Sequence, residues 1–587
     1  IIKIIGMSYI LFLLRQRRLA AILALMALTV GSWAQSGEKL VVSGIVVSGK
    51  DGAPLINATV VQKGAATATR TDVQGKFEIK VPKEAILIFS HTGYTTQEIA
   101  VEGRTRIDVI LTESSGNLDE VVVTALGIKR ESRSLGYAVT NLQVDSLTKA
   151  NEPNFINGLA GKVPGMVVTQ TAGGPGGSSR VLIRGNTTIS GDNQPLYVID
   201  GVPIENTNQG GPGGGKFAMG YDMGDVMSTL NPADIETISV LKGPSASALY
   251  GSMASNGVIM ITMKKGTKKR VSIDFTSTAT IDKQATRFEG LQQIYGQGLN
   301  GLLPQDATES QSSIFSNWGP RLDPNVNVIG FDGVERPYVM ADQSLDAFLR
   351  NGQSYTNSIS VSQALGKTSF RVAYTNLATK DIVPKTGLNR HSLNLANTIA
   401  INDKLSINLR LMYMFEKVNN RLALGDSYNN IAKSFFGLAN NIDPTIFGVN
   451  YKTADGEYVE WGGGQWNYNP YWVINEMSNT TKKDRLLSGL TLNYEFAKYF
   501  NLQLRGSADQ NGTNFEEYSP PTTPRAVTGS LVQNEGKITS LQAEAMLSFE
   551  KDLSQNFNLS ARVGANYYDF KNEGFDNVYS LMTIRDK

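Results

Sequence analysis

Few residues in this chain of 587 have the types and spacing that chemistry requires. It has two histidines, His91 and His391, and no cysteine, which excludes disulfides, thiolate metal sites and cysteine nucleophiles. His91 is followed by Thr-Gly-Tyr, without a second zinc ligand at a usual spacing, so we expect a packed or surface histidine. A hydrolase with a carboxylate pair needs two acids converging in a pocket, and no pattern indicates one. We expect no catalytic, metal or cofactor-binding residues.

Phosphate-binding chemistry has one weak indication. Residues 210 to 216 have the spacing G-x-x-x-x-G-K of a phosphate-binding loop, but Phe217 stands where that motif needs a Mg²⁺-binding hydroxyl. No predicted strand leads into the segment, so we interpret it as a glycine-rich loop. The net charge is only +2, and binding by phosphate neutralisation requires a basic excess. We therefore expect no nucleic-acid partner.

Residues 118–131, LDEVVVTALGIKRE, form the most distinctive short segment. An acidic pair, Asp119 and Glu120, precedes the β-branched run Val121 to Thr124, and this composition favours an extended strand. The segment stands between two predicted domains, so its edge could pair with a strand from another protein. An ordinary edge strand of a neighbouring domain is the alternative.

The first 34 residues resemble an export signal. Three arginines within residues 15–18 precede an apolar stretch at 19–30, and residues 32–34 place small side chains at the cleavage positions. The apolar stretch is too short to span a bilayer, and a buried helix is the alternative. The chain begins with Ile1, so we expect Met7 to be the true start.

The elements between this signal and residue 266 are short strands separated by turn residues. Residues 40–113 contain about seven such elements, which predicts one β-sandwich that resembles the transthyretin-type carboxypeptidase-regulatory-like module. Residues 132–266 mix strands with polar turns and one short helical stretch at 245–253, which predicts a second, α+β domain.

Residues 267–587 have a strict period of two. Apolar and polar residues alternate, for example, at 405–411, 490–496 and 557–563, so each strand has one apolar and one polar face. Short and long connections also alternate, which is typical of an outer-membrane β-barrel; a soluble sandwich is the alternative. We expect about nine strands of 9–11 residues, and a ligand-facing surface on long loops such as 461–472.

Nine strands are too few to enclose a domain of the size of 132–266. About 22 strands would need roughly twice the 321 residues from 267 to 587. The chain also ends without a terminal aromatic strand. We therefore expect that this sequence is truncated at its C-terminus.

Several long motifs resemble one family. LDEVVVTALGIKRE, INGLAGKVPGMVV, VLIRGNTTISGDNQPLYVIDGVPI, NPADIETISVLKGPSASALYGSMASNGVIMITMKKG and NWGPRLD occur in the order found in SusC/RagA-type TonB-linked outer-membrane transporters. The resemblance implies that 132–266 is a plug, that 267–587 is the first part of a 22-stranded barrel, and that Arg180 and Arg184 make plug–barrel contacts. It also implies a TonB-interaction segment, whose residues are Asp119, Glu120, Val121, Val122, Val123, Thr124, Ala125 and Leu126.

The same resemblance implies a function and partners. These transporters lie in outer-membrane lipid and import a nutrient, typically an oligosaccharide or peptide, together with a SusD-like surface lipoprotein. Energy comes from the proton-motive force through the TonB–ExbB–ExbD complex. A surface adhesin without active transport is the alternative, and an enzyme is the least supported reading. The sequence does not identify the substrate.

Overall fold

The computed structural model describes residues 39–580, except residues 66, 92–93, 113–120, 125–127, 132–138, 145–151, 153, 190–192, 207–218, 243–249, 286–289 and 555–556. The chain divides into two compact units, residues 1–119 and residues 120–587. The expected export signal and the glycine-rich stretch 210–216 lie outside the described residues.

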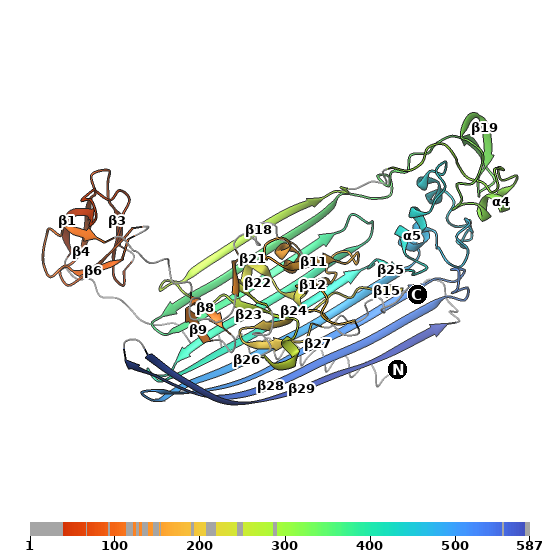
Figure 1. Ribbon diagram of the computed structural model, residues 1–587. Helices are drawn as coiled ribbons and strands as arrows, with labels where there is room; N and C mark the ends of the chain where they lie inside the picture. Colours follow the sequence, from red (N-terminus) through yellow and green to blue (C-terminus); the bar gives the residue numbers. More distant parts are fainter. Residues whose placement is uncertain are drawn as a thin grey trace. The chain divides into compact units, whose positions relative to one another are not determined.

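The first unit is the expected β-sandwich (Figure 1). One sheet has the order β4-β1-β7 and the other β3-β2-β5-β6. Strand β1 pairs antiparallel with β4 and parallel with β7. Alternate side chains of both sheets, such as Val42, Phe77 and Phe89, are buried in one core. The strands are β1 (Lys39–Ser48), β2 (Thr59–Gln62), β3 (Ala68–Arg70), β4 (Lys76–Pro82), β5 (Ile86–Ser90), β6 (Gln97–Ala100) and β7 (Val109–Leu111).

The plug contains a five-stranded sheet of order β10-β16-β17-β13-β14. Its strands are rich in Val and Ile, and β13 is buried on both faces, as its continuous apolar sequence LYVI requires. The plug elements are β8 (Val121–Thr124), β9 (Ile128–Glu131), β10 (Val139–Gln143), η3 (Phe155–Leu159), β11 (Met166–Gln170), β12 (Ser179–Ile183), β13 (Leu196–Ile199), β14 (Val202–Ile204), β15 (Met219–Tyr221), η4 (Met227–Thr229), η5 (Pro232–Asp234), β16 (Ile235–Leu241), η6 (Gly251–Ala254) and β17 (Val258–Met263).

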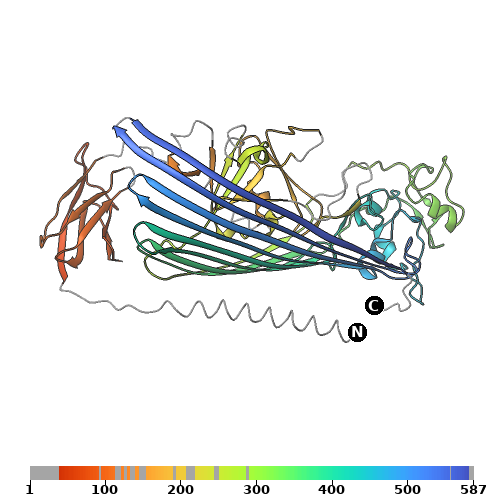
Figure 2. The same cartoon turned by 90° about the horizontal axis from the view of Figure 1, so that it is seen from below.

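Nine long strands form one antiparallel sheet, which we call the wall (Figure 2). Neighbours in the sheet are neighbours in sequence apart from small elements in the loops. The connections alternate as predicted, with short turns at 366–367, 401–404 and 498–499 among the described residues. The wall strands are β18 (Ser272–Asp282), β21 (Gly352–Leu365), β22 (Thr368–Lys380), β23 (Gly387–Ala400), β24 (Leu405–Asn419), β26 (Ser478–Ala497), β27 (Phe500–Ser519), β28 (Ser530–Ser554) and β29 (Phe557–Ser580).

The two faces of the wall are the reverse of those in a water-soluble sheet. On β26, Lys483 and Arg485 are 4% and 3% exposed, whereas Leu486 and Leu490 are 40% and 50% exposed. The plug lies against the face that carries the charges, because its core residues pack on Leu487 of that face. An apolar outer face with a polar inner face is the arrangement of a membrane β-barrel, which decides against the soluble sandwich.

Aromatic residues mark the short-turn end of the apolar face. Tyr494, Phe496, Phe500 and Phe549 follow one another across β26, β27 and β28, with ring centroids 5.0–6.1 Å apart. Such girdles lie where a barrel leaves the hydrocarbon layer. The apolar face therefore ends close to the short turns.

The wall strands are longer than predicted. They have 11 to 25 residues, against the expected 9–11. The lipid-facing apolar series on β24 does end near Phe415, but pairing continues to Asn419, which lies opposite Thr480 of β26. Ladder hydrogen bonds extend the strands beyond the apolar band, because the neighbouring strands are equally long.

The long loops 283–351 and 420–477 fold together into what we call the cap. Their apolar residues, among them Phe331, Phe348 and Phe435, form a separate hydrophobic core. Trp461 and Trp472 are fully buried, so the expectation that 461–472 is simply a ligand-facing surface was wrong at both ends. The cap elements are α4 (Ala307–Ser312), β19 (Asp323–Ile329), β20 (Glu335–Tyr338), β25 (Ala423–Gly425), α5 (Ile431–Phe436), η7 (Pro444–Gly448) and α6 (Pro470–Asn475).

Among the described residues, no helix has the length and apolar character needed to cross a bilayer.

Candidate functional site

The surface between plug and wall is the most chemically specific region of the second unit. Asp234, at the end of η5, is 2% exposed. Arg371 of β22 places Nη1 2.7 Å from its Oδ1 as an ion pair, and Asn394 of β23 donates to its Oδ2 at 3.1 Å. A buried carboxylate is tolerated only when it is paired and hydrogen-bonded. Asp234 therefore fixes the plug to two neighbouring wall strands.

A second set of contacts uses the plug backbone. Three cations donate to alternate carbonyl oxygens of residues 222–226. Arg421 of the cap, two residues after β24, donates to Asp222 at 3.0 Å, and Lys483 and Arg485 of β26 donate to Gly224 and Val226, each at 3.3 Å. Arg485 is also held by Asp509 at 2.8 Å. These contacts need the backbone shape of the turn rather than particular plug side chains.

The carboxylates of this turn are satisfied within the plug. Asp222 accepts hydrogen bonds from the amide and the hydroxyl of Ser178, at 2.7 and 2.6 Å, and from the Gly224 amide at 2.8 Å. Burial raises its pKa, but the hydrogen bonds outweigh burial, so the pKa of Asp222 lies below its usual range. Burial dominates at Asp225 and raises its pKa. Both are structural acids with full sets of partners.

The wall also contains a buried charge cluster of its own. Glu416 on β24 is 1% exposed and accepts from Arg390 Nε at 2.8 Å and from Arg421 Nη2 at 3.3 Å. Arg421 therefore joins a wall carboxylate to the plug turn. Within the described ranges, no three His, Asp or Glu side chains gather as a metal site.

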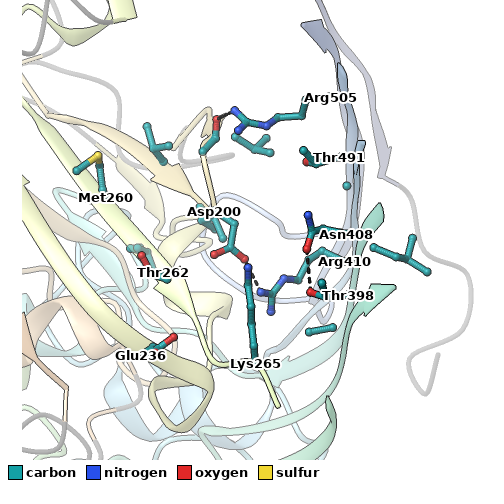
Figure 3. A pocket seen from close by; sticks show the side chains of 18 of the residues that line it. Asp200, Glu236, Met260, Thr262, Lys265, Thr398, Asn408, Arg410, Thr491 and Arg505 are labelled. Atoms are coloured by element: carbon teal, nitrogen blue, oxygen red, sulfur yellow. Dashed lines mark hydrogen bonds and ion pairs between the residues drawn. The ribbon is translucent and has the colours of Figure 1, made fainter. Parts of the chain in front are cut away.

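A cavity of about 470 Å³ separates the plug sheet from the wall near the short turns (Figure 3). It is bordered by the β13–β14 turn, where Asp200 and Gly201 have positive φ of 48° and 85°. Arg410 of β24 lies 2.6 Å from Asp200 Oδ2, and Arg505 of β27 donates to the Gly201 carbonyl at 3.0 Å. A Cβ on Gly201 would stand 2.8 Å from Arg505 Nη1, so this approach requires glycine.

The far end of the plug is joined to the cap. Plug strand β15 pairs antiparallel with cap strand β25, and the Gly220 amide donates to Ser427 Oγ at 2.9 Å. Asn429 Nδ2 donates to the Tyr221 hydroxyl at 2.6 Å, and that hydroxyl in turn donates to Glu517. Backbone pairing and side-chain bonds therefore link the plug to a loop far later in the sequence.

The predicted TonB-interaction segment is described only in part. Val121, Val122, Val123 and Thr124 form β8, which pairs with β9, so the predicted extended conformation is present there. Asp119, Glu120, Ala125 and Leu126 lie outside the described residues. The role of all eight residues in TonB binding stays a prediction.

The structure corrects the expected role of two arginines. Arg180 donates to Asn186 within the plug at 3.0 Å, and Arg184 is an exposed residue with φ of +62°. The plug–wall ion pairs instead use arginines of the wall and carboxylates of the plug. One signal could have found them: Arg371 and Arg410 occupy strand positions opposite the apolar face.

The two histidines have ordinary surroundings. His91 lies 3.1 Å from the Ile56 carbonyl and contacts the edge of Tyr94. His391 on β23 lies 2.8 Å from the Tyr374 hydroxyl. His91 is thus a packed histidine, as expected.

Known protein families match two parts of this chain. Residues 131–258 match the family described as TonB-dependent Receptor Plug Domain, and residues 42–123 match the CarboxypepD_reg-like domain. The TonB-dependent receptor SusC of Bacteroides thetaiotaomicron is 27% identical over 561 residues, which cover 92% of this chain and 51% of that protein.

Solved structures give the same fold. The RagAB peptide importer in the open-open state superposes with a TM-score of 0.59 and 20% identity, covering 78% of this chain and 50% of that chain. Its closed-closed state gives a TM-score of 0.56 and 18% identity, with 76% and 49% covered. The chain spans about half the length of the relatives that it matches. With both domain types in order and a plug seated on a barrel-like wall, the chain is similar in sequence and fold to the SusC/RagA-type TonB-dependent receptors.

Proposed function

We propose that this chain belongs to a TonB-dependent importer that carries a nutrient across the outer membrane. One observation carries the proposal: a wall with an apolar outer face holds, on its charged inner face, a plug attached through ion pairs, of which Arg371–Asp234 is buried and Arg410–Asp200 is partly exposed. A plug inside a lipid-embedded wall serves a passage that is normally closed and must be opened. A protein with a purely structural role does not need a plug that can be moved out of the wall.

The energy input would enter at the N-terminal end of the plug. Within the described ranges β8 pairs with β9 alone, which leaves its second edge for a strand of TonB. Strand β10 follows in the chain and forms one edge of the five-stranded plug sheet. Force applied near residues 119–126 therefore meets an edge strand first, and peeling an edge breaks one ladder of hydrogen bonds at a time.

The proposed partner and substrate are inferred from similar proteins. SusC is described as a TonB-dependent receptor and RagAB as a peptide importer. By analogy, we propose that a SusD-like surface lipoprotein works with this chain, that the TonB–ExbB–ExbD complex supplies the energy, and that the cargo is an oligosaccharide or peptide.

The decisive experiment removes residues 119–126 in the native host. Growth on the nutrient and uptake of its labelled form should be lost, while the amount of protein at the cell surface stays the same. A strain without TonB should show the same defect. Uptake that persists in both strains would contradict the proposal, and ligand binding without any TonB-dependent uptake would favour the adhesin alternative.

A further inference from the structure

One arginine beside the cap is held in an unusual setting. Arg525 lies in the turn 520–529 between β27 and β28, and its guanidinium carbon is 4.2 Å from the ring centroid of Tyr428 and 5.3 Å from that of Trp466. The two rings are 5.7 Å apart at an interplanar angle of 60°. Trp466 is 59% exposed. A charged group thus lies on two aromatic faces at an accessible surface.

The backbone of Arg525 is also strained. Its φ is +64°, a conformation that is unfavourable for a non-glycine residue and that concentrates at functional sites. In the part of the chain that the structure describes, the Arg525 side chain makes no hydrogen bond or ion pair. Nearby Lys433 is already 2.5 Å from Asp426 Oδ1. The guanidinium N–H groups are therefore available to an external acceptor.

We propose that Arg525, Tyr428 and Trp466 form a binding platform for a carboxylated sugar ring; this inference rests on the proposed function as an importer. The planar guanidinium fork matches a carboxylate in two-point contact. The exposed face of Trp466 matches the apolar C–H face of a pyranose. Stacking on Tyr428 fixes the guanidinium plane, so less entropy is lost when the anion binds. The substrate class is thus an oligosaccharide that contains uronate units.

The platform adjoins the connection between cap and plug. Tyr428 stands between Ser427 and Asn429, which bond to Gly220 and Tyr221 of the plug. A ligand that moves Tyr428 would also move these two contacts. A ligand bound at the platform can therefore affect the plug through the contacts between cap and plug, without any change in the wall.

The test is a binding titration of the detergent-purified full chain with tri-galacturonate at about 0.15 M salt. Maltotriose serves as the uncharged sugar and tri-glutamate as the acidic peptide. We expect Arg525→Gln and Trp466→Ala each to weaken tri-galacturonate binding by at least about tenfold. Arg525→Lys should recover part of the loss, because charge remains but the planar fork is lost. Arg321→Gln and Trp318→Ala, two exposed residues of the loop 283–351, are the matched controls and should bind as the parent does.

Three outcomes overturn the inference: maltotriose binding as tightly as tri-galacturonate, variants that bind normally, or tri-glutamate binding more tightly at the same residues, which would assign the platform to peptides. A gel-shift assay for heat-modifiable barrel structure identifies any variant that fails to fold, and Arg525→Lys then carries the test. The titration needs no TonB, so its failure leaves the importer proposal standing. Normal binding with TonB-independent uptake would reject only that proposal.

Discussion

Replacing Asp234 by Asn should loosen the plug from the wall. The carboxylate is almost inaccessible, and its partner Arg371 is 9% exposed in its side chain, so solvent screens the pair little. The new side-chain amide would keep one acceptor for Asn394 but would leave the Arg371 charge buried without a counterion. Breaking a buried pair from one side costs about 3–5 kcal/mol. Each 1.4 kcal/mol is a factor of ten, so opening of the plug should become roughly 100- to 4,000-fold more frequent.

Hydrogen exchange measures this effect directly. The amides of β16 should exchange roughly 100- to 4,000-fold faster in Asp234→Asn than in the parent protein, and cells should become more sensitive to large antibiotics that the plug excludes. Asp403→Asn is the matched control, because its pair with Lys367 is exposed (side chains 97% and 67%) and should contribute no measurable protection. Adding Arg371→Gln to Asp234→Asn should restore part of the protection. Equal exchange in Asp234→Asn and Asp403→Asn would refute the reasoning.

Three further changes test other parts of the second unit. Gly201→Ala should cost about 1–2 kcal/mol for the positive φ and displace Arg505, which faster exchange in β13 and β14 would reveal. Because the folded-state pKa of Asp222 is lowered, its stabilisation is complete above its unfolded pKa of about 4 and is lost as pH falls through the lower folded value; unfolding curves between pH 6 and 2 should show this loss, and Asp222→Asn should flatten it. Trp461→Ala should cost about 3–5 kcal/mol within the cap core, measured as faster protease cleavage in 420–477 with the wall intact.

Local patterning was sufficient to predict the wall. Alternation such as that at Leu405 to Leu411 fixes which face each side chain occupies, and the regular change between short and long connections orders the strands. The sandwich was predictable for the same reason, because its short strands are separated by turn residues. The alternation and the turn residues involve residues that are close in sequence, so they can be identified from the sequence alone.

The plug–wall contacts were not predictable in the same way. Asp234 and Arg371 are 137 positions apart in sequence. Strand alternation places Arg371 on the inner face of the wall, but nothing local identifies Asp234 as its partner. The prediction that Trp461 faces a ligand was wrong for a related reason. An aromatic residue in a long loop has the same local sequence whether it faces a ligand or packs against another loop. Trp461 is buried because the loop 283–351 packs against the loop 420–477, and this long-range contact is not visible in the local sequence.

The distribution of charge at this interface also explains why an importer would need an external pull. The cations belong to the wall and, at Arg421, to the cap, and their partners in the plug are carboxylates and carbonyls. Withdrawing the plug leaves Arg371 and Arg410 without their carboxylates, and a buried unpaired charge costs several kcal/mol until water reaches it. Several such contacts broken together exceed thermal energy by a wide margin, so spontaneous opening is rare. Force that peels the plug from its N-terminal edge breaks the contacts in sequence and admits water behind each one, which divides one large barrier into several small ones.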